Sequence, residues 1–499
     1  MLFNSAAFLL FFPFVTLLFF VFPQRVRHIW LLASSWFFYM CWNPEHLPLL
    51  VSCTLISYFC ALGIGRAEAA DMNGSKKKRL KKAVLFFGIL LDLGILFYFK
   101  YTGFAAEMLR KLFSLTGHEL MLPAVDILLP AGISFYTFQA IGYTVDVYRG
   151  DTPAERNFIR YALFVSFFPQ LVAGPIERSG KLLRQLSEPK AYDHDRARRG
   201  FFIMLWGYFL KLVIADRIAV FVNTVYESYA GVSGAFLLTA TVLFAVQIYC
   251  DFAGYSTIAV GAAAILGIGL TDNFDAPYLS VTVTDFWKRW HISLTSWFRD
   301  YVYIPLGGNR KGTIRKYLNI FTVFLLSGLW HGADITYVLW GALNGIYRIT
   351  DEMTSKLRRR ITERLHIPRD AAAFRIAGVV LTNILIDFSW ILFRAENIEK
   401  AGEITARIFT RFDISSLFDG SLLRWCGLEY AELIVSAVAI LILFIADIFK
   451  RRGISLPDRL SSLPFPVRCA VTVCAVSFIL LFGIYGSEYN AADFIYFRF

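Results

Sequence analysis

Two histidines lie in surroundings where an ionisable side chain needs a partner or a function. His331 lies in the sequence SGLWHGA (residues 327–333), and no charged residue precedes it until Lys316. A polar group in such apolar sequence is costly at membrane depth, so it is a candidate for a functional role. An imidazole changes charge near neutral pH, so it can take or give a proton. The alternative is a histidine that only bonds a carbonyl of a neighbouring helix.

The segment around His331 is too short to cross a membrane twice. Lys316 and Arg348 flank it, and both adjoin basic loops that the positive-inside rule places in the cytoplasm. Two full spans need about 20 residues each, more than residues 317–347 provide. We therefore predict a hairpin that is open to the cytoplasm, with His331 at its turn inside the bilayer.

The second histidine belongs to an aromatic segment at residues 285–301. Its aromatic residues share one arc of a helical wheel, and its charged residues lie opposite. With many Trp and one Leu, the segment is predicted to be one interfacial helix and not a span. His291 falls at the edge of the apolar face, so both histidines should face one cavity from the cytoplasmic side. The alternative is an ordinary aromatic-belt helix whose His291 bonds a lipid headgroup.

Composition places the chain among membrane proteins. Of its 499 residues 57% are hydrophobic and only 18% are charged, which is too few polar groups to cover a soluble domain. The net charge of +12 is carried mostly in short loops between apolar runs, so it indicates membrane topology and not nucleic-acid binding. The seven cysteines show no metal-ligand spacing, so we expect no metal site.

Apolar runs separated by loops of alternating basicity predict an all-α polytopic membrane protein with about 11 transmembrane helices. We expect a single membrane domain over residues 1–499, with the N-terminus and the C-terminus both outside. The Pro- and Gly-rich stretch 167–175 is too broken to span, so it should be re-entrant or buried. The expected spans are 2–22, 29–43, 47–65, 83–103, 129–148, 201–222, 235–252, a shorter piece at 255–270, 373–393, 430–449 and 467–487.

Several motifs in order resemble the membrane-bound O-acyltransferase (MBOAT) family. The resemblance is closest to the bacterial branch that includes the membrane proteins of alginate and peptidoglycan O-acetylation. It covers about residues 125–395, with a matching end near the C-terminus. The motifs are PAGISFYTFQ (130–139), VDVYRG (145–150), AGPI (173–176), DFAGYS (251–256), the WKRWH segment (287–291), YIPLGGNR (303–310), LWHG (329–332), FSWILFRA (388–395) and FIYF (494–497).

The resemblance implies a ring of tilted helices around a funnel, with the intramembrane histidine at its narrow end. It also implies acyl transfer from a thioester donor, acetyl-CoA or another acyl thioester, without a metal. His331 is then the general base, and His291 is a second catalytic candidate, although some family members carry Asn at its position. The substrate-binding residues carried over are Trp287, Trp290, Asn309, Trp330 and Asp251.

The expected function is a membrane O-acetyltransferase that moves acetyl groups across the membrane for O-acetylation of an exported polysaccharide or cell-wall glycan. No soluble domain is present to reach the glycan, so we expect a separate exported acetyl-transferring partner, besides the surrounding lipids. The tail FIYF resembles the C-terminal motif of a small peptide of teichoic-acid D-alanylation, which suggests Tyr496 as an acyl carrier; an aromatic-belt anchor is the alternative. The other functional alternatives are an acyltransferase acting on lipids or other hydroxyls and a transporter or flippase.

Overall fold

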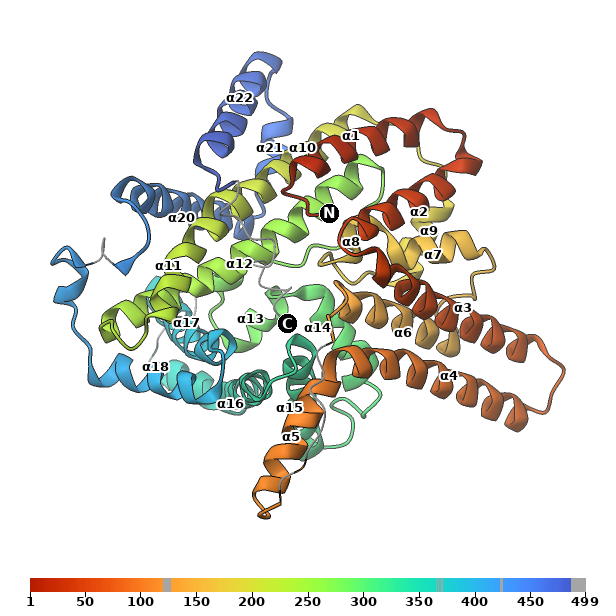
Figure 1. The fold of residues 1–499 in the computed structure, drawn as a ribbon, viewed down its shortest axis with the longest axis horizontal. Coiled ribbons are helices and arrows are strands. Elements are labelled where there is room, and N and C mark those ends of the chain that lie inside the picture. Colours follow the sequence, from red (N-terminus) through yellow and green to blue (C-terminus); the bar gives the residue numbers. More distant parts are fainter. Residues whose placement is uncertain are drawn as a thin grey trace. The chain divides into compact units, whose positions relative to one another are not determined.

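The computed structural model describes residues 1–118, 120, 127–364, 366, 368, 371–421 and 425–485. Every regular element in these ranges is helical, as expected for an all-α protein (Figure 1). The chain forms two compact units: residues 1–201 with 259–271, and residues 202–258 with 272–499. It passes from one unit to the other three times: within α10 (His194–Tyr208), within α12 (Gly234–Ile265) and between residues 271 and 272. A single domain over residues 1–499 stays a prediction.

The first unit contains the N-terminal helices. Helices α3, α4 and α6 pack against one another there, and α2 packs against α7 and α8 (Figure 1). Helix α8 and the residues around it are buried and form no span, as predicted for 167–175. The helices are α1 (Ala6–Val21), α2 (Gln24–Met40), α3 (Leu47–Ala69), α4 (Gly74–Leu96), α5 (Thr102–Ser114), α6 (Ile133–Arg149), α7 (Phe158–Ser166), α8 (Phe168–Leu171) and α9 (Ser179–Ser187).

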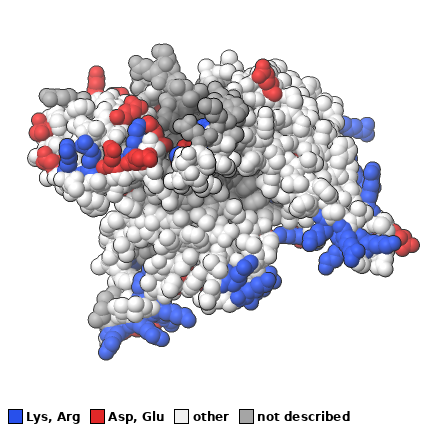
Figure 2. Space-filling view, turned by 60° about the horizontal axis from the view of Figure 1, so that its bottom comes forward, with Lys and Arg blue, Asp and Glu red and all other residues white. Residues whose placement is uncertain are grey.

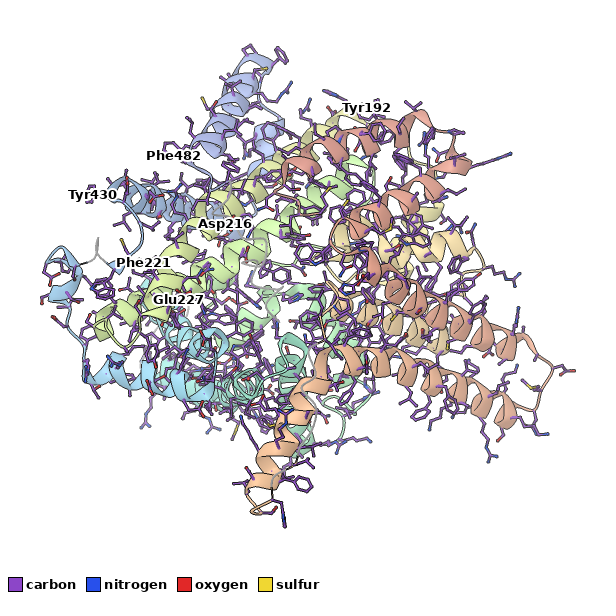
Figure 3. All side chains as sticks on the ribbon, viewed as in Figure 1. Tyr192, Asp216, Phe221, Glu227, Tyr430 and Phe482 are labelled. Atoms are coloured by element: carbon purple, nitrogen blue, oxygen red, sulfur yellow. The ribbon has the colours of Figure 1, made fainter. Side chains whose placement is uncertain are left out.

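The second unit carries both candidate histidines. Helix α11 (Asp216–Glu227) begins and ends at residues labelled in Figure 3. The other helices are α13 (Val283–Arg289), α14 (Ile292–Phe298), α15 (Thr313–His331), α16 (Ile335–Arg364), α17 (Ala372–Arg394), α18 (Ile398–Thr410), α20 (Tyr430–Arg451), α21 (Leu456–Ser461) and α22 (Phe465–Phe482).

Six helical segments among the described residues are long and apolar enough to cross a membrane, so the chain is a multi-pass membrane protein. On the face drawn in Figure 2, Lys and Arg gather in a few groups and much of the surface is uncharged, as contact with lipid requires. The number of about 11 spans and the funnel stay predictions. The six segments are Pro44–Ala69, Gly74–Ser114, Gly234–Ile265, Ala372–Arg394, Tyr430–Arg451 and Phe465–Phe482.

The prediction of separate segments at 235–252 and 255–270 is wrong, because α12 is one helix from Gly234 to Ile265. The expected break falls at Gly254, and this glycine has a packing role. A Cβ atom there would lie 2.9 Å from the backbone oxygen of Gly207 and 3.0 Å from the amide nitrogen of Lys211. Gly254 therefore continues the helix while allowing close approach of another backbone.

The turn predicted at His331 is confirmed as a tight connection between α15 and α16; its depth in the bilayer and its opening to the cytoplasm stay predictions. Helix α15 ends at His331, and α16 begins at Ile335. Two glycines allow the backbones to approach closely: a Cβ at Gly328 would lie 2.2 Å from the carbonyl oxygen of Tyr337, and one at Gly341 would lie 2.4 Å from that of Phe324. Any larger residue at either position would force the helices apart.

Candidate active site

His291 lies in a break between two short helices, so the prediction of one continuous helix over 285–301 is wrong. Helix α13 ends at Arg289, α14 begins at Ile292, and His291 between them has φ of 45°. This left-handed conformation is uncommon for a residue with a side chain. The expected inward direction of His291 is confirmed, because only 1% of its surface is exposed.

Asn273 is the residue that fixes this break. Its carbonyl oxygen accepts a hydrogen bond from the amide of Ile292 at 2.9 Å, and its Oδ1 accepts one from the amide of Ser293 at 3.2 Å. Its Nδ2 donates to the hydroxyl of Ser256 on α12 at 3.1 Å. Asn273 thereby accepts hydrogen bonds from the first two amides of α14, which have no partner within their own helix. Its bond to Ser256 connects this end of α14 to α12.

His331 lies in an aromatic cage at the end of α15. Its ring centroid lies 5.0 Å from Trp330, 5.2 Å from Trp340 and 5.4 Å from Phe393, and all three contacts are edge-on. Only 4% of its surface is exposed. Packing of this kind leaves the imidazole few orientations, so the position of His331 depends on the α15–α16 hairpin.

The two histidines face one cavity, as predicted; the cytoplasmic location of this cavity stays a prediction. Their ring centroids are 6.4 Å apart, and Trp330 lies beside both rings. The cavity has a volume of about 300 Å³ and is lined by His291, His331, Trp287 and Trp290 among others. Two imidazoles at this spacing can act on neighbouring atoms of one bound substrate. Burial lowers the pKa of His291 to about 3, so this imidazole is neutral at physiological pH.

The same cavity is lined by basic side chains. Lys288, Arg299, Lys316 and Arg348 contribute to its wall. Glu352 accepts hydrogen bonds from Lys316 and, at 3.0 Å, from Arg348. The cavity therefore combines an apolar aromatic part, which contains the histidines, with a positively charged part. This arrangement suits a ligand with one apolar and one anionic end.

The other predicted site residues lie in different places. Trp330 contacts both histidine rings without lining the cavity. Asn309 is exposed and does not line it, and Asp251 lies on α12 outside it. Tyr496 lies outside the described residues. Within the described ranges no three His, Cys, Asp or Glu residues are grouped as a metal site would require; that the reaction needs no metal stays a prediction.

Asp251 belongs to a buried group of charges. Its carboxylate accepts a hydrogen bond from the ammonium of Lys211 at 2.5 Å, and Asp216 lies 2.8 Å from the same nitrogen. The group lies close to the site, because the residue after Asp251, Phe252, contacts His291 edge-on with ring centroids 4.6 Å apart. A buried group of charges of this kind needs its partners in place. The substrate-binding role of Asp251 stays a prediction.

The sequence prediction missed Asn273 and Glu352. Asn273 gives no local signal, because its partners on α12 and α14 are distant in the sequence. Glu352 gave a usable signal, since it follows Arg348 by one helical turn and so shares a face of α16.

A multi-pass helical protein with paired buried histidines in one cavity has the features of a membrane-embedded enzyme. Comparison with known families defines it further. The model of MBOAT, the membrane-bound O-acyltransferase family, matches residues 153–381. Together with relatives that match over most of both chains, this match shows that the chain belongs to the MBOAT family and is an O-acyltransferase.

Three of the relatives are named as O-acetylating enzymes. The probable alginate O-acetylase AlgI of Pseudomonas syringae pv. tomato is 36% identical, over 91% of this chain and 83% of its own length. The probable alginate O-acetylase AlgI of Pseudomonas putida is 36% identical, over 90% of this chain and 88% of its own length. The peptidoglycan O-acetyltransferase of Helicobacter pylori is 33% identical over 75% and 72%. Membership of an enzyme family leaves the transporter alternative without support.

Proposed function

We propose that this O-acyltransferase takes an acetyl group from a cytoplasmic thioester donor and passes it across the membrane for O-acetylation of an exported polysaccharide or cell-wall glycan. The observation that carries the proposal is the cavity that contains both histidines and four basic side chains. A thioester donor has an uncharged acyl end and an anionic coenzyme or carrier end, which match these two parts. The names of the relatives support acetyl as the acyl group and a glycan as the acceptor.

His331 acts as the general base in this proposal. The base form of its imidazole takes the proton of the acceptor hydroxyl while the oxygen attacks the thioester carbonyl. The new carbon–oxygen bond forms, the carbon–sulfur bond breaks, and the departing thiolate receives the proton from the imidazolium. The aromatic cage keeps the imidazole in one orientation, so little motion is needed during the transfer.

His291 orients the reactants in this proposal. Its ring lies 6.4 Å from that of His331, too far for a direct hydrogen bond between the two imidazoles but close enough for both to contact one bound group. A neutral imidazole at His291 can donate a hydrogen bond to the thioester carbonyl as negative charge develops on its oxygen. The low pKa of His291 agrees with a hydrogen-bonding role rather than a cycle of protonation.

The final transfer to the glycan needs a separate exported partner. A coenzyme-bound acetyl group cannot leave the cytoplasm, so a group on this chain has to present the acetyl ester outside. We propose that Tyr496 carries it: the tyrosine hydroxyl accepts the acetyl group with His331 as base and then passes it to the partner. An aryl ester suits this step, because phenoxide is a better leaving group than an alkoxide.

The test is acetyl transfer by the purified chain in vesicles loaded with radiolabelled acetyl-CoA. We expect wild-type protein to release acetate slowly and to label a glycan outside only when the exported partner is added. Tyr496→Phe keeps the aromatic ring and removes the hydroxyl, so it should still cleave the donor but not label the glycan. Undiminished labelling by Tyr496→Phe would support the anchor role, and labelling without a partner would contradict the need for one.

The same assay distinguishes the alternative within the family, an acyltransferase that modifies lipids or other small hydroxyl compounds. That enzyme would transfer the label to extractable lipid or to a soluble product in the absence of any polymer.

A further inference from the structure

A second and larger cavity lies in the same unit, and the proposed acyl transfer does not use it. Its volume is about 820 Å³, and none of its lining residues lines the cavity of the two histidines. It is formed by the first turns of α17, the last turn of α20 with the residue after it, the segment between α12 and α13, and the last residue of α13. The charged residues in its wall are Asp275, Arg289, Arg375, Lys450, Arg451 and Arg452.

Positive charge exceeds negative charge in this wall by four, with five cations and one acid. Part of the excess is neutralised within the protein, because Arg289 pairs with Asp275 and with Asp285, and Arg451 lies 3.7 Å from Asp285. Lys450 keeps its charge and donates a hydrogen bond to the carbonyl oxygen of Phe274 at 2.7 Å. Arg375 and Arg452 are both exposed, and neither has an ion pair with any residue that the structure describes. These two guanidinium groups are therefore available to bind an anion that is not part of the protein.

The start of α17 adds a second feature that favours an anion. Ala371 precedes this 23-residue helix and provides no side-chain cap for its first amides. Ala372, the first helical residue, lines the cavity. The positive end of the helix dipole and its free amides therefore face the same space as Arg375.

The remaining wall is apolar and continues onto the surface of two candidate membrane spans. Leu279, Val379 and Ile448 contribute to it, together with Ile376 and Val380 of α17. Ile376 is 63% exposed and Val380 is 51% exposed. Since α17 and α20 are both long enough to cross a membrane, these exposed side chains are those that lipid chains would contact.

We infer that this cavity binds the headgroup of an anionic phospholipid. Arg375, Arg452 and the first amides of α17 would hold the phosphate, and the acyl chains would lie along Ile376, Val380 and Ile448. A soluble phosphate compound would use the basic residues but not the apolar wall, so the combination favours a lipid. Basic cavities between membrane helices are a known way of binding acidic headgroups.

The test measures lipid binding to the full-length protein in detergent by native mass spectrometry. The probes are dioleoyl phosphatidylglycerol and dioleoyl phosphatidylcholine, which share their chains and differ in net charge. We expect the wild-type protein to bind phosphatidylglycerol at least tenfold more tightly. The double variant Arg375→Gln with Arg452→Gln should weaken this binding about 25-fold, since each basic residue near an anionic lipid contributes about fivefold. It should weaken phosphatidylcholine binding less, because the choline cation of that lipid offsets the charge of its phosphate.

The matched control is Lys78→Gln with Arg79→Gln, which removes two exposed charges at the start of α4 that do not line this cavity. It should bind both lipids as the wild type does. Equal affinity for the two lipids, or equal loss in the control, would overturn the inference. So would full competition by glycerol 3-phosphate, which would indicate a site for a soluble phosphate, or a selective loss of acetyl-CoA binding in the double variant.

Discussion

The two histidines face the same cavity but are held in place by different physical means. His331 ends a long helix whose position depends on backbone contact at Gly328 and Gly341, so the whole α15–α16 hairpin holds it. His291 lies in a left-handed junction between two short helices, and a few hydrogen bonds to Asn273 hold it. The position of His331 therefore follows the packing of two long helices. That of His291 depends in part on two local hydrogen bonds to Asn273, one accepted by its side chain and one by its backbone.

This difference agrees with the proposed division of roles. A general base has to keep the same distance to the reacting hydroxyl in every turnover, which close helix packing provides. A group that only orients a substrate tolerates more local change, and the relatives that resemble this chain in sequence are expected to vary more there. Each of the following experiments distinguishes the roles of the two histidines or tests the contacts that position one of them.

Replacing His331 itself should have the largest effect. His331→Ala should fold and insert but lose about 100- to 10,000-fold in acetyl transfer, the usual cost of removing a general base. The measurement is the initial rate with radiolabelled donor in vesicles, beside His291→Ala, for which we expect a smaller loss. Near-normal transfer by His331→Ala, or a greater loss in His291→Ala, would reverse the assignment of roles.

The second experiment disturbs the hairpin without touching either histidine. In Gly328→Ala the added methyl group would lie 2.2 Å from the carbonyl oxygen of Tyr337. The two helices must therefore separate. Such overpacking costs about 1–3 kcal/mol of stability, and a shift of His331 by about 1 Å costs roughly 100-fold in rate. The thermal midpoint and the transfer rate report the two effects.

Gly402→Ala is the control for that substitution. Gly402 lies inside α18, and a Cβ atom added there would meet no other atom within 4 Å, so alanine should be neutral or slightly stabilising. If Gly328→Ala behaved like Gly402→Ala, close backbone contact would not be what positions His331.

The third experiment removes the clamp on His291. Asn273→Ala leaves the amide of Ser293 without its acceptor, at a cost of about 1–3 kcal/mol, and should lower transfer about tenfold because His291 loses its orientation. Asn397→Ala removes a comparable side-chain cap from α18, whose Oδ1 accepts from the amide of Lys400 at 2.8 Å, and should leave transfer unchanged. Combining Asn273→Ala with His291→Ala should lose no more activity than His291→Ala alone.

The sequence predicted features that depend on local composition and failed for those that depend on distant contacts. The hairpin at His331 followed from the short distance between Lys316 and Arg348, and the helical membrane class followed from composition. The break at His291 could not be predicted, because its φ of 45° is stabilised by Asn273 from another segment. The continuity of α12 was missed for a similar reason: Gly254 resembles a helix breaker until the backbone packed against it is known.

The smallest expected effect is on the pH dependence of stability, and it concerns His291 alone. Burial lowers the pKa of His291 from 6.5 to about 3, so the unfolded chain binds more protons than the folded one between these values. Stability therefore falls as the pH drops from about 6.5 toward 3, by up to about 1.4 kcal/mol per pH unit. Replacing His291 by Asn removes this contribution, so His291→Asn should lose less thermal stability than the wild type between pH 7 and pH 5. An identical loss in both proteins would show that His291 is not held neutral by burial, and its role as a neutral hydrogen-bond donor would fall with that result.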